Sequence, residues 1–250
     1  MNRLFLICLL AVMSIATVRA QSLDSLFMKV ENLRQQRITH YSDSLRDSVF
    51  QLFEAAIIEI AAHPEFCHLT PQDSAEDTTS YSGRDYAYSF MNHSTWVFSP
   101  DGRLRICSWD DLGGGSYHSY TNYLQFRDES GACTTLPIDT ATYSTEVGYF
   151  KIAQAEIESG RLYIALGYGT YGGGKQHYRV RFFQLEEGTL REREAWYPDG
   201  QELTVVCNRP QNPELTYDPD TQTISYLEFE YDEDTGFYNE TFTRRKILLK

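Results

Sequence analysis

The sequence predicts a mainly β fold, an antiparallel hairpin meander preceded by an N-terminal helical segment. Three observations predict it. Apolar residues recur at helical spacing up to Pro64, most of the later chain alternates between apolar and polar residues, and turn formers separate the alternating runs. The meander is expected to form an open sheet, a sandwich or propeller-like repeats, and the sequence leaves these alternatives open.

The first 20 residues have the composition of a secretory signal peptide. Arg3 precedes an apolar run from Leu4 to Val18, and Val18 and Ala20 are small residues at the positions that precede a cleavage site. This run of about 15 residues is shorter than the roughly 20 that a transmembrane helix needs. We therefore expect cleavage after Ala20, no membrane span in the mature chain, and a secreted, periplasmic or cell-surface location.

The chain is acidic, with 22 Lys and Arg against 35 Asp and Glu, a net charge of −13. Loss of residues 1–20 removes two arginines and no acids, which leaves 20 basic and 35 acidic residues, or −15. This charge argues against nucleic acid as a partner, because the phosphate backbone repels it. Loss of residues 1–20 also removes Cys8 and leaves four cysteines, an even number that is compatible with disulfides in three possible pairings of Cys67, Cys107, Cys133 and Cys207.

Residues 21–66 are expected to be a helical segment, with helix over 22–62 and a break near residues 39–41. Pro64 ends the helical pattern. The run AAIIEIAA is apolar nearly all round, so its turns should be covered by the rest of the fold. The apolar positions at three- and four-residue spacing are Leu23, Leu26, Val30, Leu33, Tyr41, Leu45, Val49, Leu52, Phe53, Ala56, Ile57 and Ile60.

Residues 67–85 are expected to be a linker or loop, since they carry turn formers and acids without an apolar period. Residues 86–250 are expected to form the antiparallel β domain. Its strands should be half-buried, as in Arg103–Trp109, where Leu104 and Ile106 alternate with polar residues. Turns are predicted at Ser99–Gly102, Tyr197–Gly200, Asp218–Thr221 and Asp232–Gly236, among others.

The β domain contains an internal repeat, with units at about 96–131, 155–188 and 215–250. The first two units begin with GRLRI and GRLYI, and each continues with three glycines, at 113–115 and 172–174. The third unit keeps the strand, turn and strand outline without the glycines. Each unit is therefore predicted to contain a hairpin.

Residues 169–175 match the first seven positions of a phosphate-binding loop. The match fails at Gln176, where the motif needs a Ser or Thr for magnesium, and the residues that follow alternate like a strand instead of opening a helix. We interpret the glycines as a hairpin connection and expect no nucleotide or other cofactor.

Metal sites are also disfavoured. His63, Cys67 and His68 are interrupted by Pro64, and a disulfide at Cys67 is the favoured interpretation. The acidic turns at Asp218–Asp220 and Asp232–Asp234 lack the spacing of a calcium loop.

Six aromatic residues near the glycines are the candidate ligand-binding residues, because their rings can stack on sugar faces or on peptide side chains. They are Trp109, Tyr117, Tyr120, Tyr168, Tyr171 and Tyr178. The favoured function is a non-enzymatic binding or envelope-associated module for a glycan or a protein. One alternative is a secreted hydrolase of glycosides or esters that uses Asp110, Asp111 or His118, and another is a structural module that forms a homo-oligomer.

Overall fold

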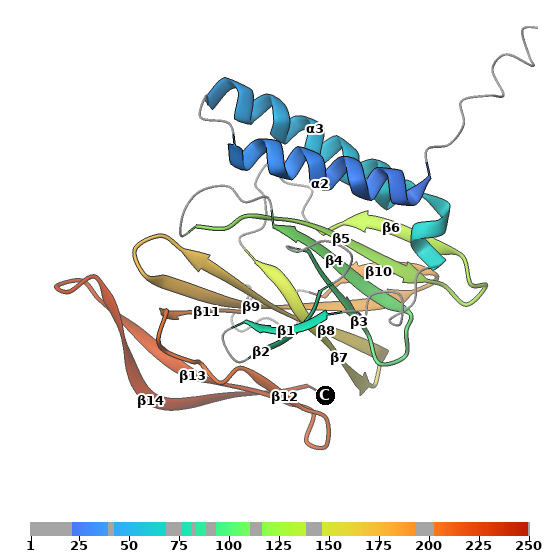
Figure 1. The fold of residues 1–250 in the computed structure, drawn as a ribbon. Coiled ribbons are helices and arrows are strands. Elements are labelled where there is room, and N and C mark those ends of the chain that lie inside the picture. The colour runs from blue at the N-terminus through green and yellow to red at the C-terminus, as the bar shows by residue number, and fades with distance from the viewer. Residues whose placement is uncertain are drawn as a thin grey trace, which may run out of the picture.

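The computed structural model describes residues 22–39, 43–68, 77–81, 84–88, 94–110, 117–138, 147–193 and 203–249. A helical layer and three antiparallel sheets are stacked on one another in chain order (Figure 1). The fold is mainly β with an N-terminal helical segment, as the sequence predicts.

The helical layer is a hairpin of α2 (Leu23–Thr39) and α3 (Asp43–Ala62), and it confirms the predicted break between them. The short 3-10 helix η1 (Pro64–His68) follows, because proline stops the α-helix. The apolar stripes face the first sheet, but Ile58 is 55% exposed, so the last turns of α3 are not covered all round. Within the described residues no helix is long and apolar enough to cross a membrane.

Sheet A consists of six strands in sequence order. These are β1 (Asp77–Tyr81), β2 (Arg84–Tyr88), β3 (Ser94–Phe98), β4 (Leu104–Asp110), β5 (Tyr120–Arg127) and β6 (Cys133–Pro137). Strand β4 is buried on both faces rather than half-buried as predicted. Leu104 and Ile106 face sheet B, whereas Cys107 and Trp109 lie under the helices.

Strand β1 and the beginning of β2 lie in residues 67–85, where the sequence predicted a linker or loop. The two strands pair over the whole of β1, from Asp77 to Tyr81. Backbone hydrogen bonds need no apolar period, and Thr and Tyr suit strands. The segment was therefore not recognisable as a hairpin from its polarity.

Sheet B packs on sheet A with one face and on sheet C with the other. It contains β7 (Gly148–Ile157), β8 (Gly160–Tyr171), β9 (Lys175–Glu186), β10 (Thr189–Glu192) and β11 (Leu203–Asn208). Successive side chains of β8 alternate between the two faces, so that Ile164 faces sheet C while Tyr163 and Ala165 face sheet A. Both cores are continuous layers of aromatic and aliphatic side chains.

Sheet C is formed by β12 (Thr216–Asp218), β13 (Thr223–Asp232) and β14 (Phe237–Leu248). The predicted turns at Asp218 and Asp232 are confirmed as the connections between these strands. The β13–β14 hairpin extends beyond the body of the molecule, at the left of Figure 1. Sheet C packs on the face of sheet B that contains Ile164, so residues 216–248 lie beside residues 160–186.

The helical layer is fixed to sheet A through η1. Cys67 of η1 forms a disulfide with Cys133 of β6, which confirms the expected disulfide at Cys67, and the other two cysteines are not bridged. Arg127 donates a hydrogen bond to the carbonyl of Cys67, and Arg105 donates one to the carbonyl of Phe66. The remaining thiols, Cys107 and Cys207, are buried.

Replacing both bridged cysteines by serine is expected to lower the free energy of unfolding by about 4 kcal/mol, because the bridge spans 66 residues and its loss frees the unfolded chain. Denaturant unfolding measures this change. A Cys107→Ser, Cys207→Ser variant is the control, and it should keep the bridge in a non-reducing peptide map. A non-reducing map of the wild-type chain that joins Cys107 or Cys207 to any other cysteine would contradict the pairing.

Candidate functional site

Two of the six predicted ligand-binding residues lie in the core. Trp109 is 1% exposed and packs with Phe66 and Tyr123 under the helices, with ring centroids 6.2 and 6.3 Å away. Tyr178 is 3% exposed and lies between sheets B and C. The two rings are inaccessible because the helical layer and sheet C cover these faces, so neither residue belongs to the surface proposed below.

Tyr120 and Tyr168, one from each glycine-containing unit, are half-buried on either side of Gly148. The Tyr120 ring lies against Gly148, where an added Cβ would be 2.9 Å from Cε1 of the tyrosine. Gly148 is in turn the register partner of Tyr168 in sheet B. The structure thus places Tyr120 of sheet A and Tyr168 of sheet B next to the same glycine. Tyr117 is also half-buried.

The glycines of the second unit form the connection between β8 and β9, and the motif is confirmed as a hairpin instead of a strand followed by a helix. Gly173 and Gly174 have φ values of 71° and 78°, which glycine adopts without strain. The first group of glycines, at 113–115, and the side chain of Tyr171 lie outside the described residues.

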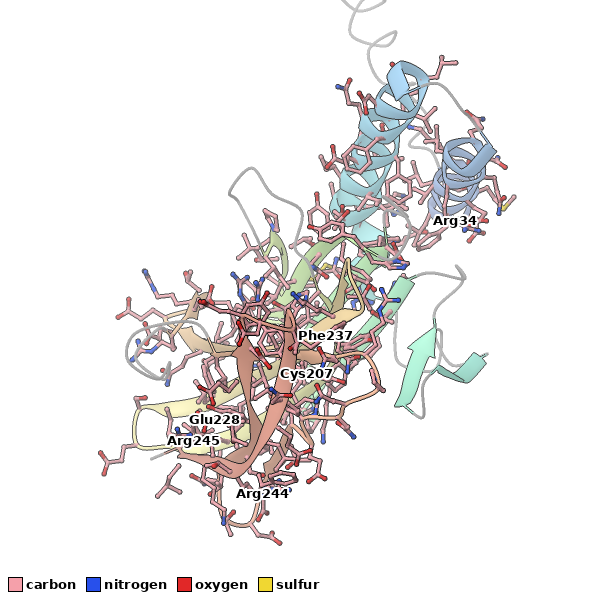
Figure 2. All side chains as sticks on the ribbon, turned by 90° about the vertical axis from the view of Figure 1, so that its left-hand side faces the viewer. Arg34, Cys207, Glu228, Phe237, Arg244 and Arg245 are labelled. Carbon is pink, nitrogen blue, oxygen red and sulfur yellow. A yellow bond between two sulfur atoms is a disulfide. The ribbon has the colours of Figure 1, made fainter. Side chains whose placement is uncertain are left out.

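The second glycine hairpin meets the β13–β14 hairpin, and we call Lys175, Tyr231, Phe237 and Tyr238 at this meeting point the aromatic tip. The Tyr231 and Tyr238 rings are 5.1 Å apart, and the Nζ of Lys175 lies 4.8 Å from the Tyr231 centroid. Tyr231 and Phe237 remain 46% and 52% exposed. Figure 2 shows Phe237 on the face of the molecule turned toward the viewer, far from Arg34 of α2.

The aromatic tip is held in place by a network of amide side chains. Asn208, the last residue of β11, makes two hydrogen bonds to the backbone of Tyr238, one as donor and one as acceptor. Gln211 also donates to the Tyr238 carbonyl, and its own carbonyl accepts from the buried Gln176. Gln176 accepts a hydrogen bond from the Tyr168 hydroxyl. The network therefore couples the predicted Tyr168 to the tip.

The turn of the β13–β14 hairpin adds ionised acceptors to the tip. Backbone hydrogen bonds from Thr235 and Asp234 hold the pKa of Asp232 below its usual range, so this carboxylate stays charged at neutral and mildly acidic pH. Burial raises the pKa of Tyr238, with Tyr231 and Cys207 adding to the shift, so the hydroxyl remains a donor. Sequence reasoning missed Tyr231, Phe237 and Tyr238, although these residues flank the predicted turn on both sides.

A second polar arrangement lies at the end of β4. The buried Asp110 is 2.7 Å from Nδ1 of His118, measured from its Oδ2. A carboxylate in this position can orient an imidazole and fix its tautomer, as in hydrolase triads. Asp111 lies outside the described residues.

No cluster of three His, Cys, Asp or Glu side chains that could hold a metal ion occurs in the part of the chain that the structure describes. Cys67 is in the disulfide, and the ring of neighbouring His63 accepts a hydrogen bond from the backbone of Glu65. No protein-family model matches the sequence, and no curated protein matches it either.

The contact between Tyr120 and Gly148 can be tested by a double-mutant cycle. Gly148→Ala is expected to lower the free energy of unfolding by about 1–3 kcal/mol, because the new methyl group overlaps the ring. In a Tyr120→Ala background the same change should cost much less. Gly172→Ala, at a turn with open space around it, is the control. Equal costs in both backgrounds would contradict the contact.

Proposed function

We propose that this protein is an exported, non-enzymatic binding module and that the aromatic tip binds a glycan. The observation that carries the proposal is the exposure of two rings of the β13–β14 hairpin, Tyr231 and Phe237, with the Nζ of Lys175 4.8 Å from the Tyr231 centroid. Isolated exposed apolar residues are common, but here two large exposed rings flank the same turn, one on each face of the hairpin.

The chemistry of the tip favours a sugar over a protein partner. Tyr231 and Phe237 lie at adjacent positions of paired strands, whose side chains point to opposite faces of the hairpin, so the exposed apolar area is two separate rings. A separate ring matches the apolar face of one sugar unit. Asp232 and Asn239 border the Phe237 face and supply oxygen acceptors for sugar hydroxyls.

The proposal places the mature chain outside the cytoplasm, as a secreted, periplasmic or cell-surface protein. The signal-like residues 1–20 and the Cys67–Cys133 disulfide support this location. The helical segment would then serve as structure that covers sheet A.

Titration of the full mature chain against soluble polysaccharides and a peptide panel tests this function. Tyr231→Ala and Phe237→Ala are expected to weaken glycan binding about tenfold or more, since each removes a stacking ring. Tyr231→Phe should keep most of the affinity, because it keeps the ring.

Phe242→Ala is the matched control, because Phe242 is an 84% exposed aromatic residue of the same strand outside the tip. It should bind like the wild type. If the tip variants lose binding to peptides but not to glycans, the partner is a protein, and the glycan proposal is contradicted. Glycan binding that neither tip variant changes would contradict it as well.

A hydrolase is the second candidate, and the hydrogen bond between Asp110 and His118 is the observation that favours it. If His118 acts as a general base, Asp110→Asn should lower kcat on an ester or glycoside substrate about a hundredfold, because the imidazole loses its orientation and charge partner. Asp220→Asn, at an exposed turn, is the control. Absence of turnover across a broad substrate panel would count against this candidate.

A further inference from the structure

The face of the aromatic tip that contains Tyr231 combines aromatic rings with a positive charge. Tyr231 and Tyr238 are register partners, so their rings share one face of the β13–β14 hairpin. Lys175 of β9 adds an ammonium group to this face, with its Nζ 4.8 Å from the Tyr231 centroid and 5.9 Å from the Tyr238 centroid. The Phe237 ring lies on the opposite face, away from this cation.

The charge of Lys175 is not neutralised by a carboxylate of the part of the chain that the structure describes. The side chain is half-buried, and its ammonium makes no hydrogen bond or ion pair with other described residues. Its Nζ is not among the buried polar atoms, so a ligand can reach it. By contrast, Arg244 and Arg245 of β14 pair with Glu214 and Glu228. Lys175 is therefore available to an anionic group of a ligand.

The ammonium is held in position before a ligand binds. A cation over a tyrosine ring is attracted by the ring quadrupole, and a group that is already placed loses less freedom on binding. The backbone of Lys175 is fixed as well, because it pairs with Tyr171 of β8 and Asn208 of β11. The hydroxyls of Tyr231 and Tyr238 make no hydrogen bond with other described residues, so both can donate to ligand oxygens.

The carboxylates near this ammonium limit the charge that a ligand can carry. Glu240 lies two residues beyond Tyr238 on the same face, whereas Glu230 and Asp232 lie on the other face. The whole chain carries −13, so a ligand with many negative charges is repelled at long range. A single ammonium in these surroundings favours a ligand with one carboxylate in an otherwise neutral structure.

We propose that the Tyr231 face binds one uronic acid unit of a mostly neutral glycan, with the sugar ring on Tyr231 and the sugar carboxylate at the Lys175 ammonium. The inference rests on the glycan function proposed above and names the sugar class for one face of the same site. A uronic acid supplies both groups at once, because its ring has an apolar face and its carboxylate is attached directly to that ring.

Calorimetric titration of the full mature chain with three probes tests the inference: a xylotriose that carries one glucuronic acid, its methyl ester, and unsubstituted xylotriose. The free acid should bind about fivefold more tightly than the ester, since the ester keeps the ring and removes the charge. Lys175→Gln should abolish this difference. Its affinity for the ester should stay that of the wild type, which also shows that the variant is folded.

Glu240→Gln tests the same charge with the opposite sign. It should bind the free acid about twofold more tightly than the wild type, because it removes a repelling charge from the same face. Glu230→Gln is the matched control, since Glu230 lies on the other face, and it should bind all three probes as the wild type does.

Three results would overturn the inference: no binding of the free acid at about 10 mM, equal affinity for acid and ester in the wild type, or a difference that Lys175→Gln leaves unchanged. In each case, binding of a neutral polysaccharide that Tyr231→Ala weakens would leave the proposed function standing. If no glycan of any kind binds, the proposed function fails and the inference fails with it.

Discussion

The burial of Arg105 between the helical layer and sheet A is the constraint on which the layered structure depends. Its guanidinium lies over the rings of Phe66, Trp96 and Phe98, with centroids 4.6, 5.3 and 5.6 Å away, and it donates hydrogen bonds to the Phe66 carbonyl and to Gln125. A buried cation without such partners would cost several kcal/mol, as an order of magnitude. Burial lowers the pKa of Arg105, yet a guanidinium remains charged at neutral pH. The helices must therefore dock where η1 presents its carbonyl.

This docking determines which face of each sheet is left for the next layer to pack on. With Cys107 and Trp109 covered by helices, the other face of β4 is left for sheet B, and the outer face of sheet B is left for sheet C. Because β8 and β9 are long and lie in the middle of this stack, their two ends emerge at opposite sides of the molecule. One end meets the β13–β14 hairpin, and the other meets the turns of sheet A.

The local parts of this structure were predictable from sequence, and the non-local parts were not. Helical spacing and Pro64 predicted the helical hairpin, and the residues after Gln176 predicted a strand. These signals depend on neighbours a few positions away. Trp109 alternates like a half-buried strand residue, and only the docking of α2 and α3, far away in sequence, makes it a core residue.

The same limit applies to the candidate site. Tyr231 and Tyr238 flank a predicted turn, so a search for aromatic pairs around turns could have found them. Their proximity to Lys175 could not be found in that way, because it results from the packing of sheet C on sheet B across the core. Tyr120 and Tyr168 were selected from their glycine-rich surroundings, and their approach depends on Gly148, a residue outside both motifs.

The two faces of the β13–β14 hairpin differ in charge because their polar groups come from different parts of the chain. Lys175 belongs to β9 and reaches the Tyr231 face through the packing of sheet C on sheet B, whereas Asp232 on the Phe237 face belongs to the hairpin itself. The hairpin register keeps the two rings on opposite faces, since a shift by one residue would exchange the faces. A substitution that shifts this register would therefore change both faces together, whereas one that loosens sheet C from sheet B would take the cation away from Tyr231 and leave the Phe237 face as it is.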